Sequence, residues 1–230
     1  MEMPGAKIIA VRCALLVGAL PIAGGALPRD AVAQEAVSFD LSSLDMGHPA
    51  MATLLEKTIF KVDVAWLEIW FTPEVDRRIG ALAAGSSKAS ADSIAAVATH
   101  ATDVLARLHF ERNVSLGQFL DGLQGSARHA RDARIISDAA YGDIVISSPT
   151  WYAFLEERGI HDGDEMLYRI RGDTLRTVFR GVEGEILLDQ RDVGPERGLS
   201  VLGGYLAPGS DFRRGLIESA ARGAAAGPAS

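Results

Sequence analysis

The sequence predicts an α+β protein, and three observations carry this prediction. The apolar stretch EKTIFKVDVAWLEIWF, residues 56–71, reads as a central β-strand. Apolar residues at helical spacing follow Ser115, which is a favourable N-cap residue. The stretch from Asp164 to Gln190 alternates apolar and polar residues in three short segments that tight turns separate, which is typical of a β-meander.

The remaining elements follow from spacing and from turn residues. Residues 106–110 alternate between apolar and polar side chains and predict a second, half-buried strand. A second helix begins near Ser137, is interrupted at residues 147–149 and resumes up to Gly159, a typical residue after a helix end. A last helix begins at Ser210. The expected order is strand, strand, two helices, β-meander and helix.

The N-terminus has the pattern of a secretory signal peptide. Lys7 and Arg12 precede an apolar run from residue 13 to residue 27, and an AVA sequence ends at Ala33. The apolar run is shorter than the roughly 18–20 residues that span a bilayer. We therefore expect cleavage after Ala33, no stable membrane anchor, and a periplasmic or secreted protein.

Composition limits the partners that the chain can have. The 230 residues carry 23 basic and 30 acidic side chains. Removing residues 1–33 takes away three basic and two acidic residues and leaves a net charge of −8. An acidic chain argues against nucleic acid and anionic membrane surfaces as partners. Cleavage also removes Cys13, the only cysteine of the sequence. An exported protein without cysteine is typical of a bacterial periplasm.

The predicted domain organisation is simple. Residues 1–33 form the signal peptide, residues 34–222 one domain, and residues 223–230 a disordered tail rich in alanine and glycine. Within the domain, residues 72–93 read as a turn followed by a loop of small residues.

Familiar catalytic and metal-binding motifs are missing from the sequence. It contains no glycine-rich phosphate-binding loop, no nucleophile elbow and no helical zinc motif. The HDGD sequence at 161–164 is too short for a calcium loop and reads as a turn between a helix and a strand. We therefore expect neither a metal nor a cofactor.

Several phrases resemble the chalcone isomerase-like family. FKVDVAWLEIWF resembles that family's central strand, RLHFERNVS the following strand, GDEMLYRIRGDTLRTVFRGVEGEILLD the meander and PGSDFRRGLIES the closing helix. The resemblance covers residues 52–220. It implies an open-faced β-sandwich, in which a large antiparallel sheet carries helices on one face and a ligand cleft lies between the two layers. Plant members of the family close a flavanone ring, and others bind fatty acids through an arginine and a tyrosine.

The family's catalytic positions carry different residues here. The position of the catalytic arginine falls on Met51, and that of the strand threonine falls on Asp63. A carboxylate at this place would repel a phenolate or a fatty-acid head group unless a basic residue pairs with it. Asp63 therefore either lines the ligand cleft or belongs to a surface or paired structural position. The resemblance then predicts no appreciable cyclisation of chalcones.

Other family positions supply candidate ligand-binding residues. The phrase ISDAAY places the family's tyrosine at Tyr141, and the asparagine seven residues later falls on Ser148. The ligand-contacting part of the closing helix falls near Arg213 and Arg214. Together with Asp63, these are the predicted ligand-binding residues.

Three functions remain open on this basis. The first is a non-catalytic exported binder of a small amphipathic ligand, either fatty-acid-like or phenolic. The second is a chalcone–flavanone isomerase, an intramolecular lyase that recruits its arginine from elsewhere in the chain. The third is a periplasmic module that binds a protein partner through Trp66, Trp70 or the arginines at 169, 171, 176 and 180 of the meander.

Overall fold

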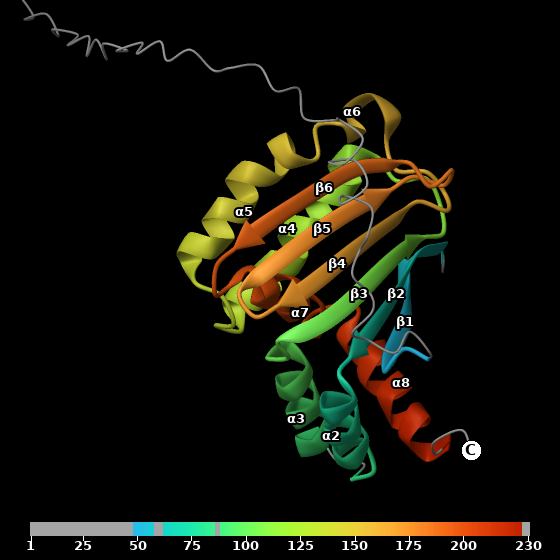
Figure 1. The fold of residues 1–230 in the computed structure, drawn as a ribbon, viewed down its shortest axis with the longest axis vertical. Helices are drawn as coiled ribbons and strands as arrows, with labels where there is room; N and C mark the ends of the chain where they lie inside the picture. The colour runs from blue at the N-terminus through green and yellow to red at the C-terminus, as the bar shows by residue number, and fades with distance from the viewer. Residues whose placement is uncertain (1–47, 58–61, 86–87, 227–230) are drawn as a thin grey trace, which may run out of the picture. The chain divides into compact units, whose positions relative to one another are not determined.

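The computed structural model describes residues 48–57, 62–85 and 88–226. Six antiparallel strands form one sheet in chain order, as Figure 1 shows. The strands are β1 (Met51–Lys57), β2 (Val62–Phe71), β3 (Asp103–Phe110), β4 (Glu165–Arg171), β5 (Thr174–Arg180) and β6 (Ile186–Val193). The predicted α+β class and its large antiparallel sheet are confirmed.

The helices fill the connections between strands and follow the last strand. They are α2 (Pro73–Ala83), α3 (Lys88–Thr99), α4 (Leu116–Asp132), α5 (Asp138–Trp151), α6 (Leu155–Arg158), α7 (Arg197–Leu206) and α8 (Arg213–Ala226). Figure 1 shows α4, α5 and α7 on one side of the sheet. All of these elements belong to one compact unit, Phe39–Ser230, whereas the unit Met1–Ser38 and the expected signal peptide lie outside the described residues.

The register of the sheet separates a buried face from a charged face. Leu67, Leu108, Met166 and Phe179 lie opposite one another on successive strands, and all are buried on the side that the helices cover. The alternate positions point to the other side. There Arg107 pairs with Glu68, and Glu165, Arg176, Arg180 and Asp189 form further ion pairs. The strand period of two thus directs the apolar residues toward the helices.

Two of the residues that the sequence suggested for binding a protein partner are buried on the charged face. Arg169 is only 6% exposed, and its guanidinium donates to the backbone carbonyls of Val104 and Ile170. Trp70 is 4% exposed, and the Arg107 guanidinium lies 5.5 Å from its ring centroid. Trp66, by contrast, is 37% exposed. Arg169 and Trp70 are therefore not available to a protein partner in the way the sequence suggested.

Several predicted boundaries were wrong. The apolar stretch 56–71 is not one strand, because β1 ends at Lys57 and pairs there with the start of β2 at Val62. The predicted turn and loop over 72–93 contain α2 and the first part of α3. Thr72 is the N-cap residue of α2, and Pro73 occupies the first helical position, where a proline is well tolerated.

Two further helices differ from the prediction. α5 continues through Pro149 without the expected interruption, since the Tyr152 N–H still donates to the Ser148 carbonyl and closes the last turn. α7 was not predicted at all. α8 extends to Ala226 and therefore includes the first residues of the segment that was expected to be a disordered tail. The last residues of that segment, 227–230, lie outside the described residues. The predicted helix end at Gly159 is confirmed by its positive φ of 69°.

The HDGD sequence forms the turn that was predicted between α6 and β4, and its last carboxylate stabilises the fold. Asp164 is completely buried and accepts hydrogen bonds from Arg158 and from the backbone N–H groups of His161 and Val182. Burial acts to raise the pKa of Asp164, but these hydrogen bonds and the charge of Arg158 outweigh it, so the pKa lies below its usual range. Among the described residues no group of three potential metal ligands occurs.

Candidate functional site

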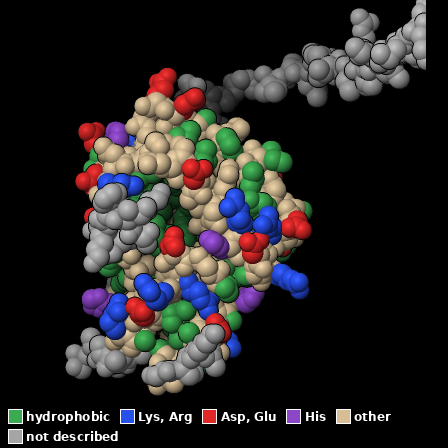
Figure 2. All heavy atoms as spheres, turned by 180° about the vertical axis from the view of Figure 1, so that it is seen from behind, with side chains coloured by type: hydrophobic (Ala, Val, Ile, Leu, Met, Phe, Trp, Pro, Cys, Tyr) green, Lys and Arg blue, Asp and Glu red, His purple; other side chains and the backbone are tan. Residues whose placement is uncertain are grey.

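A cavity of about 410 Å³ lies between the helix-covered face of the sheet and the helices α4 and α7. Figure 2 shows the hollow on this side of the molecule, with hydrophobic side chains in its interior. The volume falls within the range of about 300–1,000 Å³ that is typical of small-molecule sites.

In the described part of the chain, no helix is long and apolar enough to cross a membrane.

The floor of the cavity comes from the central strands. Ala65 of β2, Leu108 of β3, Tyr168 of β4 and Thr177 of β5 all line it. These residues share the helix-covered face, because each lies on a position that the strand register aligns with the buried core. The floor is therefore largely apolar, with two hydroxyl groups set into it.

The wall opposite the floor comes from α4 and α7, which pack very closely. A Cβ atom at Gly204 would lie 3.1 Å from the Ser126 Cβ, and one at Gly203 would lie 3.2 Å from the Ala130 Cβ. Glycine at both positions thus lets α7 approach α4 without a gap. Ser115 caps α4 by accepting from the Gln118 N–H, in a reciprocal capping box. The two helices can therefore hold their cavity-lining side chains in place.

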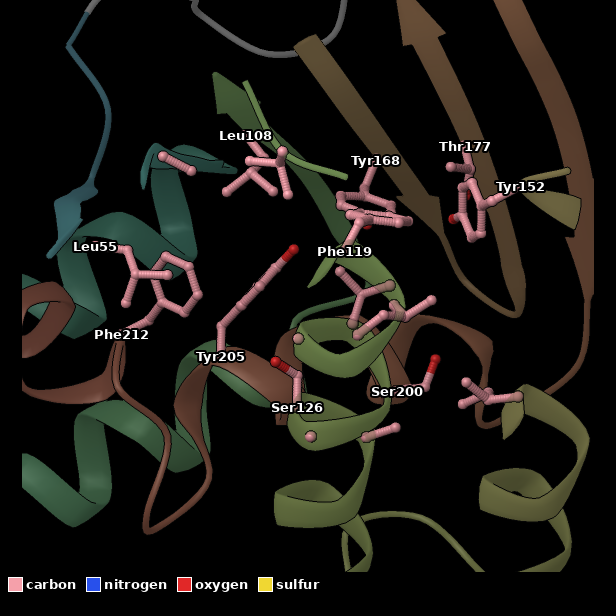
Figure 3. Close-up of a pocket in the computed structure, with 18 of the residues that line it drawn as sticks. Leu55, Leu108, Phe119, Ser126, Tyr152, Tyr168, Thr177, Ser200, Tyr205 and Phe212 are labelled. Atoms are coloured by element: carbon pink, nitrogen blue, oxygen red, sulfur yellow. The ribbon is translucent and has the colours of Figure 1, made fainter. Parts of the chain in front are cut away.

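Three buried tyrosines bring their hydroxyl groups to the inner part of the cavity. Tyr152, Tyr168 and Tyr205 line it, and Figure 3 shows the Tyr205 hydroxyl pointing toward the space between Leu108 and Tyr168. Burial is the main cause that raises the pKa of all three phenols, and their mutual proximity adds to it for Tyr152 and Tyr168. They are therefore neutral at ordinary pH. The Tyr168 hydroxyl already donates to the Met166 sulfur, so its proton is not free for a ligand. None of the three supplies a phenolate base.

A basic side chain lies at one end of the cavity. Arg112 lies two residues after the end of β3, lines the cavity and is partly buried. Its Nε atom is buried without a hydrogen-bond partner, and no ion pair joins its guanidinium to another described residue. A buried donor without a partner is costly, and a ligand anion would remove that cost. Arg112 is the group of the cavity best suited to bind an anionic head group.

A carboxylate lies at the opposite end. Asp192 of β6 lines the cavity beside Gln190, whose side-chain amide donates to both carboxylate oxygens at 3.2 and 3.1 Å. Among the described residues no basic side chain forms an ion pair with Asp192. Ser200 of α7 and Trp151 of α5 also line the cavity.

The structure does not bring the predicted ligand-binding residues together at this cavity. Tyr141 packs between α4 and α5, and the Arg131 guanidinium lies 4.4 Å from its ring centroid. Ser148 is fully buried, and its hydroxyl has no hydrogen-bond partner. Neither residue lines the cavity.

Arg213 and Arg214 do not line the cavity either. Arg213 pairs with Asp92 and donates to the Leu206 carbonyl, so it joins α8 to α3 and to the end of α7. The Arg214 side chain is 90% exposed, and its nearest carboxylate is Glu218 at 4.0 Å. Asp63 lies on β2 opposite Glu56, and its side chain falls outside the described residues. A role in ligand binding stays a prediction for all five residues.

The position of the family's catalytic arginine holds a core residue. Met51 is completely buried on β1 and does not line the cavity. The cation of this site comes instead from Arg112, at a different place in the chain. That the protein does not cyclise chalcones stays a prediction.

Sequence reasoning missed the residues that do line the cavity. Tyr168 and Thr177 lie in the predicted meander, but the alternation that predicted its strands does not indicate which of its residues line a cavity. Tyr205 lies on α7, which was not predicted. Arg112 lies just after β3 and Asp192 near the end of β6. No local sequence pattern indicates that neither residue forms an ion pair with another residue that the structure describes.

Comparison with known proteins gives a structural match. No family model matches the sequence, and no curated protein matches it. The structure is similar to that of an Arabidopsis thaliana fatty-acid-binding protein, with a TM-score of 0.53 and 13% sequence identity over 76% of this chain and 89% of that chain. The fold is chalcone isomerase-like. At this identity the likeness concerns the fold alone, and it agrees with the architecture that the sequence resemblance implied.

Proposed function

We propose that this chalcone isomerase-like protein is a non-catalytic binder of a small amphipathic ligand, either fatty-acid-like or phenolic, that acts in a periplasm or outside the cell. The observation that carries the proposal is a largely apolar cavity with, at one end, an arginine nitrogen that has no hydrogen-bond partner among the described residues. The fatty-acid-binding neighbour of the same fold supports it.

The chemistry of the cavity supports ligand binding. Its walls offer apolar side chains to a hydrocarbon or an aromatic ring. Its tyrosines have raised pKa values and are therefore neutral, so they place no negative charge against a ligand. Each buried CH₂ group contributes about 0.8 kcal/mol to the free energy of transfer from water. An anionic head at Arg112 would then fix the orientation of the apolar body.

An Arg112→Gln variant tests this proposal by calorimetric titration with palmitate and with palmityl alcohol, which share one chain and differ in their head groups. A hydrogen bond to a charged group contributes about 1.5–3 kcal/mol, so palmitate affinity should fall about tenfold or more. The affinity for the uncharged alcohol should stay nearly constant.

The matched control is Arg214→Gln. This variant removes the same charge from an exposed position on α8 and should leave both affinities unchanged. If palmitate affinity fell in Arg214→Gln but not in Arg112→Gln, the head group would bind near Arg214, as the family resemblance suggested, and not at Arg112. If neither lipid binds to the wild-type protein, the proposed function is wrong.

Export is a separate part of the proposal. It rests on Lys7, Arg12, the apolar run after them and the AVA sequence that ends at Ala33. The exported protein should begin at Gln34 or within a few residues of it, and Edman sequencing of protein from the periplasm or the medium measures this directly. A mature protein that still contains Cys13 would contradict the predicted cleavage.

A further inference from the structure

We propose that the ligand has two polar ends, an anion that binds Arg112 and a hydrogen-bond donor, such as a hydroxyl group, that binds Asp192. This inference rests on the proposed function and specifies the class of ligand. A simple fatty acid has only the first of these ends, so the inference predicts an ω-hydroxylated or similarly substituted chain.

Asp192 has hydrogen-bonding capacity that the described residues leave unused. A carboxylate has two oxygens and about four lone-pair sites, and the amide of Gln190 is the one side-chain donor that the described structure places on them. Asp192 shares the cavity-facing side of β6 with Gln190, since both alternate with the outward-facing Asp189 and Arg191. A donor on a ligand in the cavity would therefore find an available acceptor.

Asp192 lies beside an apolar part of the cavity wall. Its partner on the neighbouring strand, Leu175, is apolar and also lines the cavity. The charge of Asp192 also acts on the buried Tyr152, whose pKa it helps to raise after burial and Tyr168. The carboxylate thus faces the interior of the cavity and not only the solvent beside β6.

The two polar ends lie far apart along the sheet. Asp192 on β6 is aligned across the sheet with Val104 on β3, through the paired residues Leu175 and Ile170. Arg112 lies beyond Phe110, which is at the other end of β3. Six residues of strand separate Val104 from Phe110, which corresponds to about 20 Å. A long-chain ligand can reach both ends, whereas a single phenolic ring cannot.

The charges also determine the orientation of the ligand. A carboxylate at the Asp192 end would be repelled, and a methyl group there would leave the Asp192 acceptor unused. An anion at Arg112 with a hydroxyl group at Asp192 satisfies both ends. A long-chain dicarboxylate meets the wrong charge at one end, so it should bind more weakly than a chain with one carboxylate.

A structural explanation for Asp192 exists as well. β6 is an edge strand, and charged residues that point inward on edge strands oppose pairing with other chains. Under this explanation an Asp192→Asn variant would aggregate more readily, and its preference among ligands would not change. The order of ligand affinities therefore distinguishes the two roles.

The test measures the affinities of palmitate, ω-hydroxypalmitate and hexadecanedioate for the wild-type protein, Asp192→Asn and Asp189→Asn. Asp189→Asn is the matched control, because it removes the same charge from the opposite face of the same strand. The wild type and Asp189→Asn should bind ω-hydroxypalmitate about tenfold more tightly than palmitate, with hexadecanedioate weakest. Asp192→Asn should bind hexadecanedioate more tightly than the wild type does and should lose most of the preference for the hydroxyl group.

Each other outcome decides against the inference. If palmitate binds but the order of affinities is the same in Asp192→Asn as in the wild type, the ligand has one polar end and the proposed function stands. If Asp189→Asn changes the order as strongly as Asp192→Asn, the effect comes from net charge and not from the cavity. If none of the three lipids binds to any variant, the inference and the proposed function are both wrong.

Discussion

Replacing Asp164 by alanine lowers the free energy of unfolding by about 3–5 kcal/mol, the usual cost of removing one partner from a buried ion pair. The substitution leaves Arg158 without its main carboxylate and leaves the backbone N–H groups of His161 and Val182 without acceptors. Urea denaturation measures the loss. Asp162→Ala changes an exposed carboxylate of the same turn and should cost less than about 0.5 kcal/mol. Equal losses in the two variants would show that the turn, and not the buried pair, carries the stability.

The same carboxylate makes stability depend on pH. The pKa of Asp164 is lowered in the folded protein, so its contribution is fully present above the pKa of an unfolded aspartic acid, about 3.9. The contribution is lost as the pH falls below that value and through the lower pKa of the folded state. The Asp164→Ala variant should therefore lose less stability than the wild type between about pH 5 and pH 2. If the free energy of unfolding fell equally with pH in the two proteins, this role of Asp164 would be contradicted.

The second large effect concerns the cavity. Ala65 is 2% exposed on β2, and its side chain lines the cavity floor. In an Ala65→Trp variant the indole ring occupies space that a ligand chain would need. If the ring displaces about four CH₂ groups, the lost transfer free energy is about 3 kcal/mol, which weakens palmitate binding roughly a hundredfold. Stability should change little, because the ring enters an existing space.

Ala106→Trp is the control for this substitution. Ala106 lies on the same face of the sheet and is completely buried, but it does not line the cavity. A larger side chain in a packed core typically costs about 1–3 kcal/mol, so this variant should be destabilised while the cavity stays open. A stable Ala65→Trp protein that binds palmitate as tightly as the wild type would contradict the cavity as the ligand site.

Local patterns were enough to predict much of the sheet. The meander β4–β5–β6 was predicted because its alternation and its turns lie within one short stretch, and Gly172 takes the positive φ of 53° that its tight turn requires. The start of α4 was also predicted from a short stretch, because Ser115 and the apolar residues after it lie close together in the sequence. α7 was missed because its sequence RGLSVLGGYL contains three glycines, which weaken a helical pattern. Those glycines have a packing role that becomes visible only beside α4 and Ile170.

The candidate site could not be predicted in the same way. The cavity depends on how far α4 and α7 stand from the sheet, and no short stretch of sequence contains that distance. That the Arg112 Nε atom has no hydrogen-bond partner within the described part of the chain depends on which acceptors the fold places near it. The family resemblance gave the correct fold but directed attention to Tyr141 and Ser148. In this chain those two residues pack on α5 away from the cavity.

The central claim is that the cavity between the sheet and α4 and α7 holds one small amphipathic molecule. Native mass spectrometry of wild-type protein and of Ala65→Trp, both purified without detergent and then mixed with ω-hydroxypalmitate, measures occupancy directly. The account predicts one bound lipid per wild-type chain and none on Ala65→Trp. An equal lipid content on the two proteins, or no bound lipid on the wild type, would contradict it.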